Sequence, residues 1–163
     1  MEGHCHLLHI LVTQLEAKVT MENGRGETAL DRAAWNGKFE AVKTMLDLGA
    51  DVLHRSKIRF TALHYACDFG NPGVSNPKSL QPIARVLLEA GVNVNEKDED
   101  GWNCLHLASA NGHSEVLQVL LEAGVDILDV DEDGNTALHL AAAVGHAEVA
   151  KVLVEAAGSR SFF

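Results

Sequence analysis

A short motif recurs four times along the chain, and its spacing constrains the fold more than any other feature. The copies are "TALDRAA" from Thr28, "TALHYAC" from Thr61, "NCLHLAS" from Asn103 and "TALHLAA" from Thr136, at intervals of 33, 42 and 33 residues. A fixed period of this length is typical of a repeat protein, in which each copy of the motif belongs to one structural unit. The long interval exceeds the others by 9 residues, and we assign these to an inserted loop within 71–82.

Each copy has the elements of a helical pair. It begins with a residue whose side-chain oxygen can cap a helix. A glycine that can adopt the left-handed conformation at a helix end follows nine positions later, at Gly37, Gly70, Gly112 and Gly145. A second apolar stretch, such as "SEVLQVLLEAG", comes next, followed by a polar, turn-rich tail. We therefore predict two helices per unit and an extended hairpin leading to the next unit, with Leu105 and Leu138 buried between units.

A period of 33 residues with "TALHLAA", "GHAEV" and "VLLEAG" resembles the ankyrin repeat family. The resemblance implies an all-α fold, a solenoid of stacked helix pairs with projecting β-hairpin-like loops. It divides a single domain, 1–163, into a partial unit and four full units, at 1–25, 26–57, 58–97, 98–131 and 132–158, with a tail at 159–163. Arg59 departs from the pattern, because the other units have glycine there, and we expect a distorted hairpin at that position.

The net charge and the cysteine content indicate which kinds of partner and which cellular compartment the sequence favours. The net charge of −10 argues against a nucleic-acid partner, since phosphate binding depends on Lys and Arg. The whole imbalance lies after residue 60. Three cysteines without metal-ligand spacing, Cys5, Cys67 and Cys104, indicate reduced thiols and an intracellular location, cytoplasmic or nuclear. No apolar run reaches the roughly 20 residues of a membrane-spanning helix, so no membrane insertion is expected.

The stretch 129–134 begins like a calcium-binding loop. Asp129, Asp131 and Asp133 alternate and are followed by Gly134. A calcium loop also requires a bidentate Glu at its twelfth position, and that position is Leu140. A similar acidic turn, "KDEDG", occurs one repeat earlier, so the repeat explains the pattern better than calcium binding does.

Catalytic motifs are not apparent in the sequence. His64, His106 and His139 share one repeat position, and in the ankyrin family such a histidine orders the hairpin through hydrogen bonds. The sequence contains no nucleophile elbow, phosphate-binding glycine loop or zinc-protease motif. We therefore expect no catalytic residue, no cofactor, no metal and no enzymatic activity.

The resemblance also indicates where a partner would bind, because ankyrin-like solenoids contact proteins through hairpin tips and the exposed ends of first helices. The outward repeat positions are Glu27, Trp35, Asn36, Lys57, Ile58, Phe60, Asp68, Phe69, Glu99, Asp100, Trp102, Ala110, Asn111, Glu132, Asp133, Asn135, Ala143 and Val144. Four of the eight aromatic residues of the chain lie at these positions, and Trp is enriched in binding hot spots. We predict an apolar strip of Trp35, Phe60, Phe69 and Trp102 beside acidic hairpins.

These features predict a monomeric, non-enzymatic module that binds another protein, through a basic or mixed apolar and basic segment. Two alternatives stay open: a stand-alone inhibitor of an enzyme such as a kinase, and the ankyrin portion of a larger protein whose activity lies elsewhere. Asn95 resembles the hairpin asparagines that intracellular hydroxylases modify in ankyrin repeats, although turn geometry alone also favours asparagine there.

Overall fold

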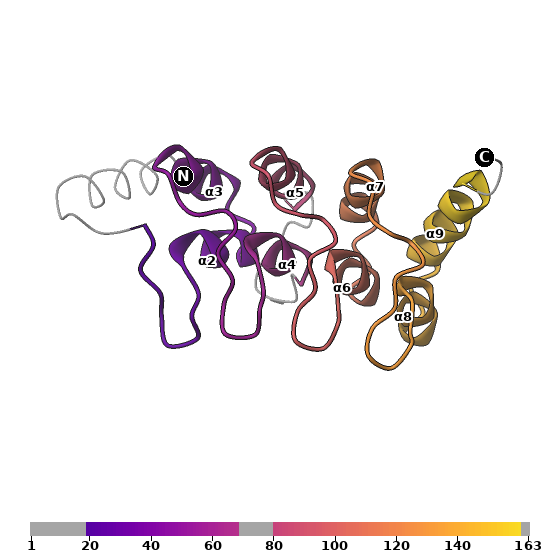
Figure 1. Cartoon of the computed structure of the whole chain (residues 1–163). Helices are drawn as coiled ribbons and strands as arrows, with labels where there is room; N and C mark the ends of the chain where they lie inside the picture. Colours follow the sequence, from indigo (N-terminus) through magenta and orange to yellow (C-terminus); the bar gives the residue numbers. More distant parts are fainter. Residues whose placement is uncertain (1–18, 69–79, 161–163) are drawn as a thin grey trace.

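A computed structural model of the chain describes residues 19–68 and 80–160, and over these ranges it forms eight helices and no strand (Figure 1). The first helices of the pairs are α2 (Ala29–Trp35), α4 (Ala62–Cys67), α6 (Cys104–Ala110) and α8 (Ala137–Val144). The second helices are α3 (Phe39–Asp47), α5 (Leu80–Glu89), α7 (Ser114–Glu122) and α9 (Ala147–Arg160). The predicted helical solenoid is confirmed. Most of the predicted N-terminal partial unit, up to residue 18, lies outside the described residues.

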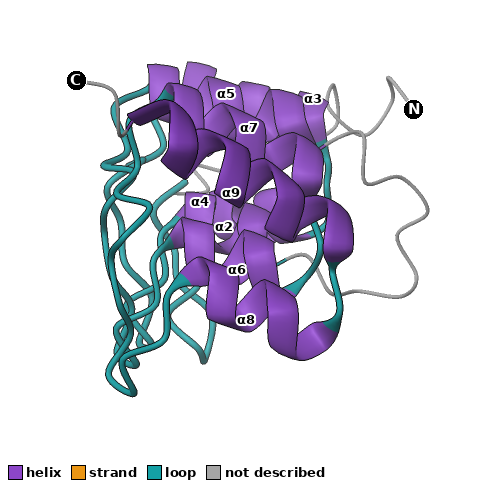
Figure 2. Cartoon of the chain, turned by 90° about the vertical axis from the view of Figure 1, so that its right-hand side faces the viewer, coloured by secondary structure: helices purple, strands orange, loops and turns teal. Residues whose placement is uncertain are grey.

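The helices form two layers. The first helices stack in one layer and the second helices in the other, and the long loops leave the stack on one side (Figure 2). Each helix packs on the other helix of its pair and on the corresponding helix of the next pair. This nearest-neighbour packing brings the loops between pairs into a row, at the lower edge of Figure 1.

Helix caps at the repeat positions confirm how the first helices begin. Thr28, Thr61, Asn103 and Thr136 are the N-caps of α2, α4, α6 and α8. In α6, the Asn103 side-chain oxygen accepts from the backbone N–H of His106 at 3.2 Å, and the Asn103 N–H donates to Nδ1 of His106 at 3.2 Å. This reciprocal capping box satisfies backbone donors that a helix start leaves unpaired.

The apolar core runs along the interface between units. Leu30, Leu63 and Leu105 occupy one repeat position and are almost completely buried. Leu138 occupies the same position in α8, yet 38% of it is exposed, so the prediction that it is buried is wrong. The physical reason is that no described helix pair follows α8 and α9 to cover this face.

The turn at Arg59 keeps the shape of the glycine turns. Arg59 has a φ of 63°, close to the 79° of Gly101 and Gly134. The turn is closed by the Ser56 N–H, which donates to the Phe60 carbonyl at 2.9 Å, as in the other hairpins. The expected distortion is therefore wrong. The hairpin instead holds an arginine in the left-handed region, where a side chain is unfavourable.

Two boundaries differ from the sequence prediction. Helix α9 continues to Arg160, beyond the predicted end of the last unit at residue 158. A glycine caps α8, where Gly145 has a φ of 87°, but α9 has Ala157 at the position where a glycine would end it. The inserted loop also ends earlier than predicted, because α5 begins at Leu80. Residues 71–79 lie outside the described part of the chain.

Candidate protein-binding face

The hairpin tips are held by side chains that accept hydrogen bonds from the backbone. Asp98 Oδ1 accepts from the N–H groups of Asp100 at 2.9 Å and Trp102 at 2.8 Å. One repeat later, Asp131 Oδ1 accepts from Asp133 and Asn135 at 3.0 and 2.7 Å. Burial raises the pKa of Asp98, even though the hydrogen bonds to its carboxylate oppose that shift. These bonds fix the direction of the exposed residues at each tip.

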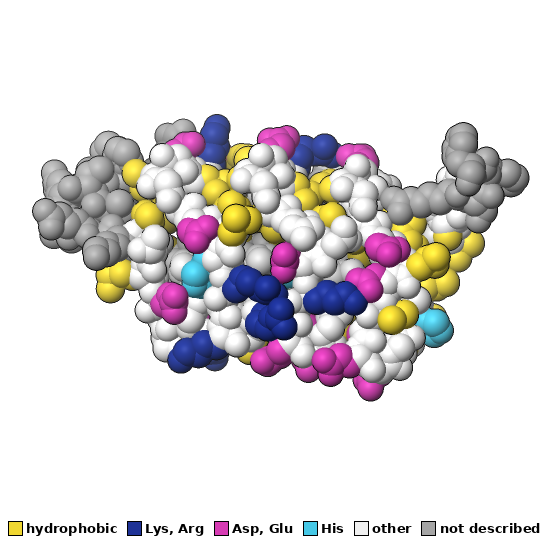
Figure 3. Space-filling model, viewed as in Figure 1, with side chains coloured by type: hydrophobic (Ala, Val, Ile, Leu, Met, Phe, Trp, Pro, Cys, Tyr) yellow, Lys and Arg dark blue, Asp and Glu magenta, His cyan; other side chains and the backbone are white. Residues whose placement is uncertain are grey.

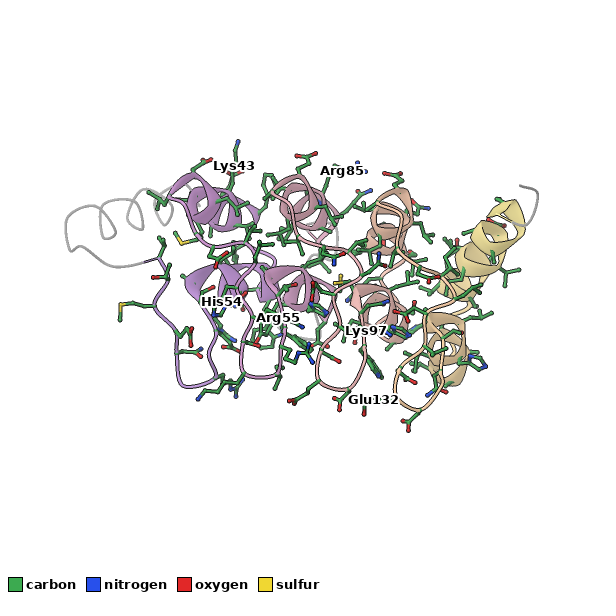
Figure 4. All side chains as sticks on the ribbon, viewed as in Figure 1. Lys43, His54, Arg55, Arg85, Lys97 and Glu132 are labelled. Carbon is green, nitrogen blue, oxygen red and sulfur yellow. The ribbon has the colours of Figure 1, made fainter. Side chains whose placement is uncertain are left out.

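The remaining aspartate of the calcium-like pattern links two units. Asp129 Oδ1 lies 2.6 Å from Nζ of Lys97, and Asp129 Oδ2 accepts from Nδ2 of Asn103 at 3.1 Å. Figure 4 shows Lys97 in the hairpin region, beside the labelled Arg55. Within residues 19–68 and 80–160, no group of three or more His, Cys, Asp and Glu side chains is placed to hold a metal ion.

Two of the three shared histidines connect a first helix to the following hairpin. His64 Nε2 lies 3.1 Å from the carbonyl oxygen of Glu96, and His106 Nε2 lies 3.2 Å from that of Asn135. The expectation that these histidines order the hairpins is confirmed for His64 and His106, whereas His139 contacts Thr136 of its own helix cap. Burial lowers the pKa of His64 from 6.5 to about 4, because the charged ring would lose its hydration.

A hollow lies between the second and third hairpins. Its volume is about 330 Å³, and it is lined by Ile58, Phe60, Asp98, Glu99, Asp100, Trp102 and Leu107. We call it the acidic hollow, because its charged lining residues are all carboxylates.

A second hollow lies between the first and second hairpins. Its volume is about 510 Å³, and it is lined by Gly24, Arg25, Glu27, Arg32, Trp35, Lys57, Ile58, Phe60, Tyr65 and Asp68. We call it the basic hollow, because Arg25 and Lys57 are exposed at its edge. The guanidinium of Arg32 lies 4.5 Å from the centre of the Trp35 ring, a cation–π contact that holds the indole in place.

Two predicted outward residues are buried. Phe60 is only 8% exposed, since its ring stacks on His64 with centroids 5.3 Å apart and meets Tyr65 edge-on at 5.2 Å. Glu27 is also buried, and Arg32 lies 3.7 Å from its carboxylate. The expected outward orientation is wrong for both, although both still line a hollow.

The other predicted residues divide into exposed and half-buried groups, with Phe69 outside the described residues. Exposed are Lys57, Ile58, Glu99, Asp100, Glu132, Asp133, Ala143 and Val144. Half-buried are Trp35, Asn36, Asp68, Trp102, Ala110, Asn111 and Asn135. The hollows bring together the members from the second and third hairpins with Trp35 and Asp68, at the ends of α2 and α4, whereas Asn36, Ala110 and Asn111 line neither hollow. The fourth-unit residues lie outside both hollows.

Some lining residues were not predicted. Arg25, Arg32, Tyr65 and Leu107 line the hollows without having been among the expected contacts. A signal for Arg25 was present, because it immediately precedes Gly26 just as Asp100 precedes Gly101. The repeat register therefore places Arg25 at a hairpin tip.

Asn95 has a structural partner. Its side chain is exposed, and Oδ1 accepts a hydrogen bond from the backbone N–H of Asp126 at 3.0 Å. The amide thus links one hairpin base to the next. Its modification by a hydroxylase stays a prediction.

Comparison with known proteins agrees with this architecture. The family model described as "Ankyrin repeats (3 copies)" matches residues 1–76 and 74–160. BCL-6 corepressor-like protein 1 of Homo sapiens is 35% identical over 101 residues, which are 61% of this chain and 5% of that protein. SMC5-SMC6 complex localization factor protein 1 of Homo sapiens is 38% identical over 95 residues, 58% of this chain and 8% of that protein. Protein phosphatase 1 regulatory subunit 27 of Homo sapiens is 34% identical over 76 residues, 47% of this chain and 44% of that protein.

The chain belongs to the ankyrin repeat family. Ankyrin repeats are a protein-interaction fold, generally without enzymatic activity. The chain spans less than a tenth of the length of the first two relatives described. None of the helices in the described part of the chain is long and apolar enough to cross a membrane.

Proposed function

We propose that this chain is a non-enzymatic module that binds another protein through its hairpin tips and the ends of its first helices. The observation that supports the proposal most directly is Trp102, half-buried in the acidic hollow beside exposed Glu99 and Asp100. A partly covered indole offers apolar area at small entropic cost, as hot-spot residues do.

The partner segment that suits this site is basic, or mixed apolar and basic. The exposed carboxylates of Glu99, Asp100, Glu132 and Asp133 lie on two successive hairpins. In Figure 3, Asp and Glu gather at the lower edge under the C-terminal units, and Lys and Arg lie further toward the N-terminal ones. Such a row of exposed charges steers an oppositely charged partner into contact.

A second candidate function is regulation of an enzyme by direct binding. It is favoured by the likeness to protein phosphatase 1 regulatory subunit 27, of which this chain covers 44%. In either case the chain would act as the ankyrin portion of an assembly, and any catalytic step would belong to another polypeptide or domain.

Affinity capture from cell extract tests the proposal. The parent chain, a Trp35→Ala and Trp102→Ala double variant, and a Lys43→Ala control are immobilised at equal amounts, and the captured proteins are quantified by mass spectrometry. Lys43 lies on the second-helix layer, away from the hairpins (Figure 4). We expect proteins that the parent and the control retain and the double variant loses. Identical captured sets for all three chains would contradict the proposed binding face.

A further inference from the structure

The acidic and basic hollows lie side by side and share a wall. Ile58 and Phe60 line both of them, so the second hairpin separates the two. The chain has two tryptophans, and one lies in each hollow: Trp35 in the basic hollow and Trp102 in the acidic hollow. Both volumes, about 330 and 510 Å³, are within the range of pockets that bind ligands.

The basic hollow carries uncompensated positive charge. Arg25 and Lys57 are exposed and make no ion pair within the described residues. The Lys57 ammonium donates to the carbonyl oxygen of Gly24 at 2.8 Å. The Glu27 carboxylate is buried and already accepts from Nδ2 of Asn23 at 2.6 Å. Asp68, the other carboxylate of the lining, is half-buried and lies 3.5 Å from Nδ2 of Asn111, so the exposed charges at the edge are those of Arg25 and Lys57. A carboxylate of a partner would therefore be favoured at this edge.

The acidic hollow carries uncompensated negative charge. Glu99 and Asp100 are exposed and have no cationic partner within residues 19–68 and 80–160. The buried Asp98 adds a third carboxylate to the same lining, which contains no Lys or Arg. A cation of a partner would be favoured here, and an anionic membrane or nucleic acid would be repelled.

We propose that the two hollows bind one extended protein segment with segregated charges: an acidic end over Arg25 and Lys57, two apolar anchors beside Trp35 and Trp102, and a basic end over Glu99 and Asp100. This inference rests on the proposed function and adds an acidic end to the mixed apolar and basic segment proposed there. Packed helices lie about 10 Å apart, and an extended chain advances about 3.3 Å per residue. The two hollows are one helix spacing apart, because the second hairpin separates them, so anchors at the centres of the hollows are about three residues apart. Opposite charge at the two ends fixes the direction in which the segment lies.

Synthetic peptides test the charge pattern directly. One peptide has two aspartates, a leucine, two serines, a leucine and two lysines, and is prepared in both chain directions. A matched peptide keeps the composition and the leucine spacing but exchanges one aspartate with one lysine, so that each end is neutral. Binding of labelled peptide to the parent chain is measured by fluorescence anisotropy. We expect the segregated peptide, in one of its two chain directions, to bind at least about fivefold more tightly than the matched peptide. Two or more exposed ion pairs provide a difference of this size. Equal affinities, or no binding by any peptide, would overturn the inference.

Charge reversal on the protein supplies a second test. A double variant with Arg25→Glu and Lys57→Glu should bind the segregated peptide about tenfold more weakly than the parent chain does. Replacing the aspartates of the peptide by lysines should restore the affinity, which a merely misfolded variant could not do. The control is Lys43→Glu with Glu89→Lys, two exposed positions on the second-helix layer with the net charge kept constant. An equal loss in the control, or no recovery with the lysine peptide, would contradict the inference.

Orientation is read from the two tryptophans. In a Trp102→Phe variant the emission comes from Trp35, and in a Trp35→Phe variant it comes from Trp102. A nitroxide on the acidic end of the peptide should quench Trp35 strongly and Trp102 weakly. Equal or reversed quenching would overturn the proposed direction. If the peptides fail while capture of a natural partner still depends on Trp35 and Trp102, this inference is wrong and the proposed function stands.

Discussion

The ammonium of Lys97 lies 2.6 Å from a carboxylate oxygen of Asp129, and this contact joins two successive hairpins. Arg55 and Glu96 make the corresponding contact one unit earlier, at 3.2 Å. The pairs occupy equivalent repeat positions, so the acidic residues before the turns serve as links between units. Each partly exposed pair contributes about 0–1 kcal/mol, and their greater effect is to fix the hairpin register.

The chain is predicted not to bind calcium specifically. Asp129 is engaged by Lys97, Asp131 accepts backbone hydrogen bonds, and Leu140 stands where a bidentate Glu is required. Isothermal titration at physiological salt should show no saturable site tighter than about 10⁻⁴ M. A tighter site that disappears in Asp131→Ala would contradict the structural assignment of these aspartates.

Equivalent leucines should contribute unequally to stability. Leu105 is 1% exposed, so Leu105→Ala should cost about 2–5 kcal/mol through lost burial and a residual cavity. Leu138 is 38% exposed, and Leu138→Ala should cost about 1 kcal/mol, because less apolar area leaves contact with protein. Urea denaturation of both variants measures the difference. Equal losses would mean that the open face beside α8 is covered in solution.

Stability should decrease as the pH falls below 6.5, in part because of His64. Its pKa is about 4 in the folded chain and near 6.5 when unfolded. Between these values the unfolded state binds a proton that the folded state does not, so the contribution of His64 is complete above pH 6.5 and is lost toward pH 4. The slope is about 1.4 kcal/mol per pH unit. The geometry agrees, since Nδ1 accepts from the Thr61 N–H at 3.2 Å and a protonated ring could not.

Urea denaturation at pH 7.5 and pH 5.0 tests this assignment. A His64→Gln variant should lose the contribution of His64 to the pH dependence. Leu105→Ala serves as the control, because it destabilises the chain and leaves every titratable group in place. The same pH slope in the parent and in His64→Gln would be inconsistent with a buried, neutral His64.

Arg59→Gly should stabilise the chain by about 1 kcal/mol. The residue has a φ of 63°, in a region that is unfavourable for a side chain by about 1–2 kcal/mol and open to glycine. Arg59→Ala is the control, because it removes the charge and keeps the strain, and it should not stabilise. Both effects are measured from denaturation midpoints. Stabilisation by alanine as well as glycine would show that charge, rather than backbone strain, is the cause.

The repeat made most of the fold predictable from sequence. The motif starting at Thr28 defines the cap and first helix of every unit, and its recurrence defines the stacking. The individual errors arise where a neighbour decides the outcome. Phe60 is buried because His64 and Tyr65 offer ring faces, and Leu138 is exposed because no described unit covers it. A prediction from the repeat pattern gives Phe60 and Leu138 the same burial as the residues at the same repeat positions in the other units.

The candidate site was predictable only in part. Trp35, Lys57, Trp102 and the acidic tips follow from repeat positions, whereas the meeting of Arg25 and Lys57 in one hollow does not. The first 60 residues are neutral overall, and this balance hides the way in which hairpin packing brings Lys57 to Gly24, next to Arg25. A contact between residues that are 33 positions apart in the sequence depends on how the units stack. Counting charges along the sequence gives no information on that stacking.

The affinity of a Trp102→Ala variant for a partner captured by the parent chain tests the central claim most directly. Truncating an anchor of this kind commonly costs about 2 kcal/mol or more of binding free energy. Such a loss raises the dissociation constant about 30-fold. The account predicts such a loss with an unchanged circular dichroism spectrum, and no loss for Lys43→Ala. Full affinity in the folded Trp102→Ala variant would contradict the assignment of this face as the site of binding.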